Sequence, residues 1–230
     1  MNVIKSRHST RTSFNSNRKI RRTDLAAVIE AARWSPTAHN MQNFEIIIVD
    51  DPNILKAIGN LRSRISEEFL RENYDQLSFS KKELQRKKVG ILGSHFPRAW
   101  RDPTKLHDVA VHSPAVPLRE TIQDAPVVLI VIYDPRKRAP ASPGDFLGIM
   151  SLGCVMENMW LVAQSRHISF QVMSVFGSPQ VEAELRRILN FPRHTKIAYA
   201  IRLGYVRGGF SVDYLRVRRE PAAIAHYNRY

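Results

Sequence analysis

Three segments of this sequence combine cationic and amide side chains that could do chemistry. They are residues 7–11, which read Arg-His-Ser-Thr-Arg, residues 37–42, and residues 216–219 near the end of the chain. Two arginines that flank a serine offer paired, positively charged N–H donors and a hydroxyl group, which suit a phosphate or the polar edge of a heterocycle. The alternative interpretation of each arginine cluster is that it belongs to a solvent-exposed surface without a ligand, as is common in so basic a protein.

The sequence contains no recognised acid, base, nucleophile or metal motif. It lacks a zinc spacing, a P-loop, Gly-x-Gly-x-x-Gly and a nucleophile elbow, and its eight histidines are scattered, so we expect no metal site. The single cysteine, Cys154, excludes a disulfide framework within the chain, and we interpret it as a small helix filler. An anion site without catalytic groups fits an enzyme whose cofactor performs the chemistry.

Composition predicts one globular domain over residues 1–230. Apolar residues make up 43% of the chain, which is ample for a core, and no linker divides it. The net charge of +14 favours polyanions or phosphorylated small molecules. Nucleic-acid binding rests on that charge alone, because no helix-turn-helix, zinc finger or RNP signature is present. The N-terminus has no apolar segment of a secretory signal, so a cytoplasmic location is expected.

The element around which the other segments are arranged is a predicted helix over residues 145–166. It is apolar on every face, which is typical of a helix buried in a core or a subunit interface. Glu157 interrupts its apolar run, which favours a soluble core over a membrane span. Small or polar residues at helical spacing would let a second backbone approach closely; they are Gly148, Ser151, Cys154 and Asn158.

The other elements follow from periodicity and caps. Strands are predicted over residues 44–49, 127–133, 168–176 and 196–204. Helices are predicted from a Thr23 cap to Pro36, after a capping box at Ser80, and from Ser178-Pro179 to Pro192. Residues 93–124 show no clear period, which is typical of a functional lid or a mobile segment. Residues 206–230 form an arginine-rich arm.

In these segments the chain resembles the FMN-dependent nitroreductases. Members open with an Arg-Arg-Ser-x-Arg-like motif, matched by residues 7–11, and continue with a Pro-Ser-x-x-Asn-x-Gln-Pro-Trp-like loop, matched by residues 36–44. The central helix, the strand after it and the basic tail also have counterparts, whereas Asn43 stands where proline is usual. The resemblance implies an α+β fold with a mixed, mainly antiparallel sheet flanked by helices, in an intertwined homodimer.

The resemblance also implies a set of FMN contacts: Arg7, His8, Ser9, Arg11, Asn40, Gln42, Met173, Ser174, Arg216, Arg218 and Arg219. Arg7 and Ser9 would meet the phosphate and the ribityl chain. Arg11 would face the pyrimidine edge of the ring, where a cation stabilises the negative charge of reduced flavin. Asn40 and Gln42 would reach the flavin of the partner subunit. The backbone after Met173 would pass beside the ring, and the tail arginines would complete the phosphate site or form a solvated arm around the partner.

The implied activity is that of an FMN-dependent oxidoreductase. Hydride from NAD(P)H would pass through flavin N5 to an electron-poor acceptor such as a nitroaromatic or a quinone, without a catalytic residue of the protein. Alternatives on the same fold are flavin fragmentation, azoline oxidation and flavin storage. Within residues 93–124, Phe96 and Trp100 would stack on the acceptor or would only pin the segment to the core, and Arg98 and Arg101 could meet the phosphates of NAD(P)H. We expect neither a nucleic acid nor a membrane as partner.

Overall fold

The structure is a computed structural model that describes residues 1–72, 78–93, 97–207 and 215–228. These residues form two compact units. The first unit comprises Met1–Ser63 and Pro117–Gly209, and the second comprises Arg64–Val116 and Phe210–Tyr230. The expectation of a single domain over residues 1–230 stays a prediction.

The first unit is built on a four-stranded antiparallel sheet. Its strands are β1 (Phe44–Val49), β6 (Val127–Tyr133), β8 (Lys196–Gly204) and β7 (Ser169–Met173), in the spatial order β1-β6-β8-β7. All three neighbouring pairs run antiparallel. The predicted α+β class and the strands over residues 44–49, 127–133 and 196–204 are therefore confirmed.

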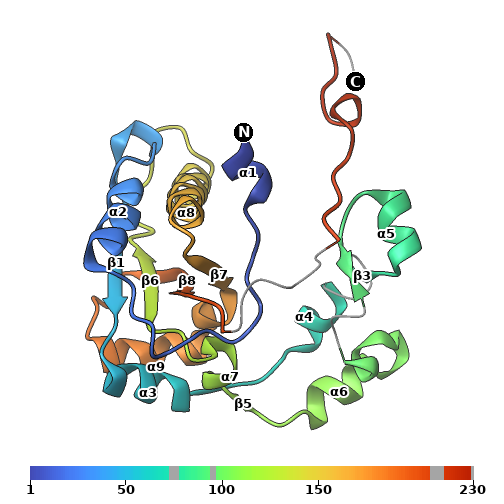
Figure 1. Cartoon of the computed structure of the whole chain (residues 1–230), viewed down its shortest axis with the longest axis horizontal. Helices are drawn as coiled ribbons and strands as arrows, with labels where there is room; N and C mark the ends of the chain where they lie inside the picture. The colour runs from blue at the N-terminus through green and yellow to red at the C-terminus, as the bar shows by residue number, and fades with distance from the viewer. Residues whose placement is uncertain (73–77, 94–96, 208–214, 229–230) are drawn as a thin grey trace. The chain divides into compact units, whose positions relative to one another are not determined.

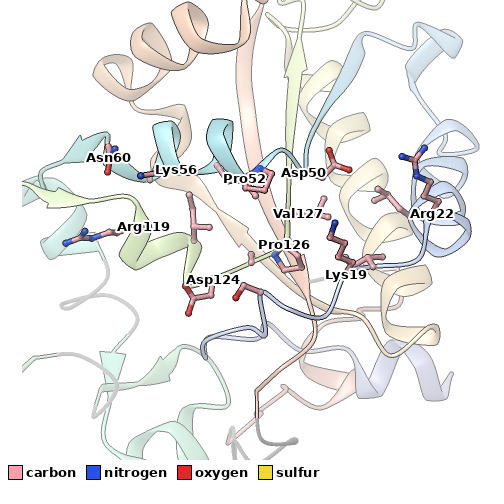
Figure 2. Close-up of a pocket in the computed structure, with 17 residues that line it drawn as sticks. Lys19, Arg22, Asp50, Pro52, Lys56, Asn60, Arg119, Asp124, Pro126 and Val127 are labelled. Carbon is pink, nitrogen blue, oxygen red and sulfur yellow. The ribbon is translucent and has the colours of Figure 1, made fainter.

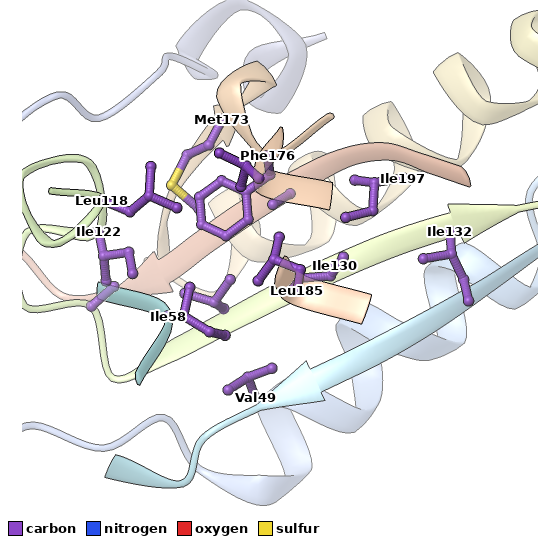
Figure 3. Packing of buried hydrophobic residues seen from close by; sticks show 14 of the residues in the cluster. Val49, Ile58, Leu118, Ile122, Ile130, Ile132, Met173, Phe176, Leu185 and Ile197 are labelled. Atoms are coloured by element: carbon purple, nitrogen blue, oxygen red, sulfur yellow. The ribbon is translucent and has the colours of Figure 1, made fainter. Parts of the chain in front are cut away.

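Helices cover both faces of this sheet (Figure 1). One face packs against α2 (Arg22–Arg33) and α8 (Phe146–Ser165), and the other against α3 (Pro52–Asn60), α7 (Arg119–Ile122) and α9 (Pro179–Leu189). The continuous apolar run of β6 reflects this arrangement, because its successive side chains point to opposite, equally buried faces. Figure 3 shows the core on the α3 and α9 face, where Ile130 of β6 lies among Ile58, Phe176 and Leu185.

The central helix is confirmed as α8, within one residue of the predicted bounds at each end. It is long and apolar enough to cross a membrane by length and composition alone. Several of its side chains are instead buried against α2 and the sheet, and the hydroxyl of Tyr199 donates to Leu152 O at 2.9 Å. α8 is therefore part of the core of the first unit.

The small-residue stripe of α8 contacts the same chain. Residues 35–43, here called the Asn40 loop, pack along it: Ser151 Oγ accepts from the backbone N–H of Ala38 at 2.9 Å, and Asn158 Nδ2 donates to Ser35 Oγ at 2.9 Å. A Cβ on Gly148 would lie 2.9 Å from Asn43 Nδ2, so only glycine fits there without a shift. Cys154 is exposed in the single chain, so its interpretation as a small filler of the helix stays a prediction.

Two predicted boundaries differ from the structure. α2 begins at Arg22, so Thr23 lies inside the helix and is not its cap; Arg21 precedes the helix without a side-chain cap. The strand predicted over residues 168–176 ends at Met173, because Ser174–Gly177 forms the 3₁₀ turn η6. Phe176 remains buried in this turn, where it packs with Met173 in the cluster on the α3 and α9 face, opposite to Ile168 and Phe170.

The second unit consists of short elements. They include α4 (Glu67–Arg71), α5 (Lys81–Lys87) and α6 (Leu106–His112), and the capping box at Ser80 is confirmed at the start of α5. Its small core centres on Leu70 and Leu106. Further elements of the described residues are α1 (Asn2–Ser6), β2 (Arg62–Ser63), β3 (Ser78–Phe79), β4 (Ile91–Leu92), β5 (Val116–Pro117) and the 3₁₀ helices η1 (Ala38–Asn40), η4 (Arg98–Arg101), η5 (Pro103–Lys105) and η7 (Pro221–Ala223).

Candidate functional site

The first part of the candidate site is the chain that follows α1. Residues 7–14, here called the Arg7 segment, run beside β7, where the backbone N–H of Thr10 donates to Phe170 O at 3.0 Å. The segment contains four of the sequence-predicted site residues. His8 Nδ1 lies 3.1 Å from Ser6 O, Ser9 is half-buried and Arg11 is exposed. The structure therefore places the predicted cations and the serine on one short segment at the β7 edge of the sheet.

Arg7 is held against α8 by two contacts. Its Nε lies 3.1 Å from the carboxylate of Glu157, and its guanidinium carbon lies 4.5 Å from the ring centroid of Trp160. Trp160 in turn stacks on Phe170 at 4.9 Å between centroids and 14° between planes. The cation–π contact and the ion pair both hold the guanidinium in a fixed position. The Arg7 side chain still keeps 23% of its surface exposed, so a ligand can reach it.

The Arg7 segment is anchored by Arg202, which no sequence motif had indicated. Arg202 of β8 is fully buried and donates from Nη2 to Thr10 O at 3.1 Å and to Thr12 O at 3.0 Å. Its Nε donates to Gln171 Oε1 at 2.8 Å, and its guanidinium lies 4.5 Å from the ring centroid of Phe14. One side chain thus ties the segment to β7 and β8. The available signal was an arginine inside an otherwise apolar strand.

Several polar atoms near the Arg7 segment have unused hydrogen-bonding capacity. Trp160 Nε1, Ser169 Oγ and Thr12 Oγ1 are buried, and none has a hydrogen-bond partner in the described part of the chain. Leaving a buried donor or acceptor unpaired costs about 1–3 kcal/mol. These groups, with the cations of the segment, form a donor set that suits a polar, anionic ligand such as a nucleotide cofactor.

The second part of the candidate site is the tip of the Asn40 loop. His39, Asn40 and Gln42 all have positive φ values, of 51°, 52° and 45°. Three non-glycine residues in the left-handed region within four positions store backbone strain, which is concentrated at functional sites in proteins. The conformation is held by Gln42 Nε2, which donates to Asn40 Oδ1 at 3.0 Å, and by the backbone N–H of Gln42, which donates to Thr37 Oγ1 at 3.1 Å.

Within one chain, the Arg7 segment and the tip of the Asn40 loop do not lie together. The Asn40 loop leads into β1 and the Arg7 segment lies on β7, and these strands are the opposite edges of the sheet. Three strand spacings separate the edges by about 14 Å. Along α8, Ala38, which precedes the tip of the loop, contacts Ser151, whereas Arg7 contacts Glu157, six residues or about 9 Å further along the helix.

The remaining predicted site residues lie outside the Arg7 segment and the Asn40 loop. Met173 is buried in the core, so only its backbone is available, and Ser174 is exposed at the start of η6. Arg216, Arg218 and Arg219 belong to the second unit, and their approach to the Arg7 segment stays a prediction. Phe96 lies outside the described residues.

Trp100, the other predicted acceptor contact, is half-buried and packs against the cluster formed by Leu70 and Leu106. This contact favours the interpretation that Trp100 pins its segment to a core.

The electrostatics beside Gln42 keep one carboxylate ionised. Gln42 and Asp134 line a cavity of about 130 Å³. Hydrogen bonds from the Arg136 guanidinium hold the pKa of Asp134 well below its ordinary value, so this carboxyl does not act as a proton donor near neutral pH. Among the described residues, no group of three or more His, Cys, Asp or Glu side chains could hold a metal ion.

Comparisons with known proteins agree with this architecture. The chain matches the solved structure of a nitroreductase with bound FMN from Bacteroides fragilis at 20% sequence identity and a TM-score of 0.59. It matches a nitroreductase family protein from Clostridium difficile at 15% identity and a TM-score of 0.60, and a nitroreductase with bound FMN from Desulfitobacterium hafniense at 18% identity and a TM-score of 0.57. Each of the three matches covers 99% of this chain and 97% of the other chain. At these identities the likeness shows the fold. No curated protein matches the sequence. The family model of the nitroreductases matches residues 4–205, which is most of the sequence, and the chain therefore belongs to the nitroreductase family.

Proposed function

We propose that this protein is a cytoplasmic, FMN-dependent oxidoreductase that takes hydride from NAD(P)H and passes it to an electron-poor acceptor such as a nitroaromatic or a quinone. The observation that carries the proposal is the Arg7 segment, a cationic segment fixed at the β7 edge by Arg202 in a chain of the nitroreductase family. Bound FMN would supply the redox chemistry, accepting hydride from the donor and giving it to the acceptor.

The protein's own residues would bind and orient the cofactor. Arg7, held by Glu157 and Trp160, would present its charge to the phosphate, with the hydroxyl of Ser9 beside it. Arg11 is exposed on the same segment and would stabilise negative charge at the pyrimidine edge of the ring. Main-chain groups at Met173 and Ser174, where β7 gives way to η6, would lie along the ring.

A homodimer would complete this site. Asn40 and Gln42 lie at the opposite sheet edge from the Arg7 segment, so a second copy would have to bring them to the flavin. α8 also presents an exposed apolar face to a partner: Phe146, Ile149 and Met150 are 57%, 50% and 53% exposed, and Gly153 and Cys154 continue the face at helical spacing. Exposed apolar patches of this kind mark protein interfaces.

The tail arginines and Trp100 have subordinate roles in the proposal. One of Arg216, Arg218 and Arg219 would add a second cation to the phosphate site. Trp100 would belong to a substrate lid, and the substitution Trp100→Ala separates this role from simple packing. A lid residue changes kcat/KM among acceptors at constant flavin content and melting temperature, whereas a packing residue lowers the melting temperature and leaves acceptor preference unchanged.

Anaerobic spectroscopy tests the proposed reaction. The FMN-loaded protein should lose its flavin absorbance on addition of NADH or NADPH and regain it when a nitroaromatic or a quinone is added. Comparing the two nucleotides identifies the donor. A flavin that stays oxidised with both nucleotides, yet is reduced by dithionite, would exclude the NAD(P)H-dependent activity and leave the other chemistries of this fold.

A further inference from the structure

One cavity of the first unit lies away from the residues that the proposed function uses. It has a volume of about 560 Å³ and is lined by residues of α3, α7, the start of α2 and the chain that leads into β6. None of the residues of the Arg7 segment or the Asn40 loop lines it. Residues with buried or half-buried apolar side chains form its floor: Ile20, Leu25, Leu55, Ile122, Ala125 and Val127.

The rim of this cavity is charged. Figure 2 shows Lys56 and Arg119 toward one end of the cavity and Lys19 and Arg22 toward the other. Two carboxylates, Asp50 and Asp124, also line the cavity. Four cations against two carboxylates leave the rim net positive.

These charges do not neutralise one another within the first unit. In the described part of the chain, no ion pair within 4 Å involves any of the four cations or either carboxylate of the rim. Cations that line a cavity without a carboxylate partner are available to an anionic ligand, which they attract strongly next to an apolar wall. The cavity thus offers both hydrophobic contact and charge.

Local packing fixes the backbone position of one of these cations. α3 and α7 meet at Gly59, where an added Cβ would lie 3.2 Å from the Cβ of Arg119. The backbone N–H of Leu118 also donates to Leu61 O at 2.8 Å, which ties the start of α7 to the end of α3. The Cβ of Arg119 is therefore positioned at the cavity wall, and the rest of its exposed side chain is available to a ligand.

We propose that this cavity, the Arg119 cavity, is a second binding site for a small organic anion, a phosphate ester or a carboxylate on an apolar body. The apolar body would lie on the floor, and the anionic group would meet Arg119 and Lys56. Ligand sites in proteins combine an apolar lining with a few convergent polar groups in this way. The site is separate from the flavin site, so it would bind its ligand without displacing the cofactor.

Calorimetry on the FMN-loaded protein, freed of unbound FMN because that molecule is itself a phosphate ester on an apolar body, tests the proposal with four probes. Phenyl phosphate and benzoate carry both required features, inorganic phosphate lacks the apolar body, and phenol lacks the charge. We expect phenyl phosphate or benzoate to bind at one site per chain, more tightly than phosphate or phenol, and their ratio identifies the preferred anion. Equal binding of phenol would contradict the role of the cations, and equal binding of inorganic phosphate would contradict the role of the floor.

Substitutions locate the binding in the cavity. Lys56→Gln together with Arg119→Gln should weaken the better probe about tenfold or more, because the variant loses both charge-assisted hydrogen bonds to the anion. Both side chains are exposed, so the variant should keep its circular dichroism and its flavin content. Lys196→Gln, an exposed lysine of β8 outside the cavity, is the matched control. Equal weakening by the control, unchanged binding in the double variant, or no binding of either organic anion would overturn the proposal.

Discussion

Replacing Arg202 by methionine should detach the Arg7 segment and destabilise the protein strongly. Arg202 is fully buried and donates to the carbonyl oxygens of Thr10, Thr12 and Ile122 and to the side chain of Gln171, at 2.8–3.1 Å. Each hydrogen bond to a charged group contributes about 1.5–3 kcal/mol, but burying the guanidinium has a desolvation cost that methionine removes. We therefore expect a net loss of about 3–5 kcal/mol, because four acceptors lose their donor at about 1–3 kcal/mol each and the removed desolvation cost offsets part of this loss.

Urea unfolding of the two proteins measures this loss as a lower midpoint at a similar m-value. Trypsin adds a local readout, because cleavage after Arg11 should become faster once Thr10 and Thr12 lose their anchor. Arg202→Lys keeps the charge but has only three donors on a flexible stem, so it should rescue stability in part. If Arg202→Met unfolds within about 0.5 kcal/mol of the wild type, as surface substitutions do, and Arg11 stays protected, the assigned anchoring role is wrong.

Three further predictions concern the cofactor, the dimer and pH. Arg7→Gln should lower the affinity for FMN about tenfold or more and leave the affinity for riboflavin unchanged, because only FMN carries the phosphate. An equal loss of affinity for both flavins would show that Arg7 does not contact the phosphate. Ile149→Glu on the exposed face of α8 should lower the mass measured by light scattering from that of a dimer to that of a monomer. Val111 is exposed to a similar extent, and Val111→Glu should leave the mass unchanged. A wild-type protein with the mass of a monomer would contradict the proposed dimer. Hydrogen bonds from Arg21 and Arg166 lower the pKa of Asp24. The stabilising contribution of Asp24 should therefore be present above the ordinary pKa of aspartate and be lost as pH falls through the lowered pKa. If the melting temperature of Asp24→Asn falls as steeply with acid as that of the wild type, this prediction is wrong.

The strands and long helices could be predicted because each has a local pattern. β6 is a continuous apolar run and β1 is rich in β-branched residues, and both appear with the predicted bounds. The end of β7 could not be predicted, since apolar residues continue beyond Met173 and Phe176 is still buried, although it lies in a 3₁₀ turn. For α8, an apolar composition on all faces did not show that residues 35–43 of the same chain cover Gly148 and Ser151.

The candidate site was predictable only where a motif carried it. The residues of the Arg7 segment were found from their type and spacing, but their anchor was not, because Arg202 is 190 residues or more away in sequence from Thr10 and Thr12. The same limit applies to the Arg119 cavity, whose cations come from three separate segments of the chain. Contacts between distant residues leave no periodic signal in the sequence.

The flavin content of the purified protein decides whether it is an FMN enzyme. The protein should be denatured and its supernatant separated by chromatography against FMN, FAD and riboflavin standards. We expect a yellow protein that releases FMN, close to one per chain after reconstitution, with no flavin left covalently attached to the precipitate. A colourless protein that also fails to bind added FMN would exclude FMN as its cofactor.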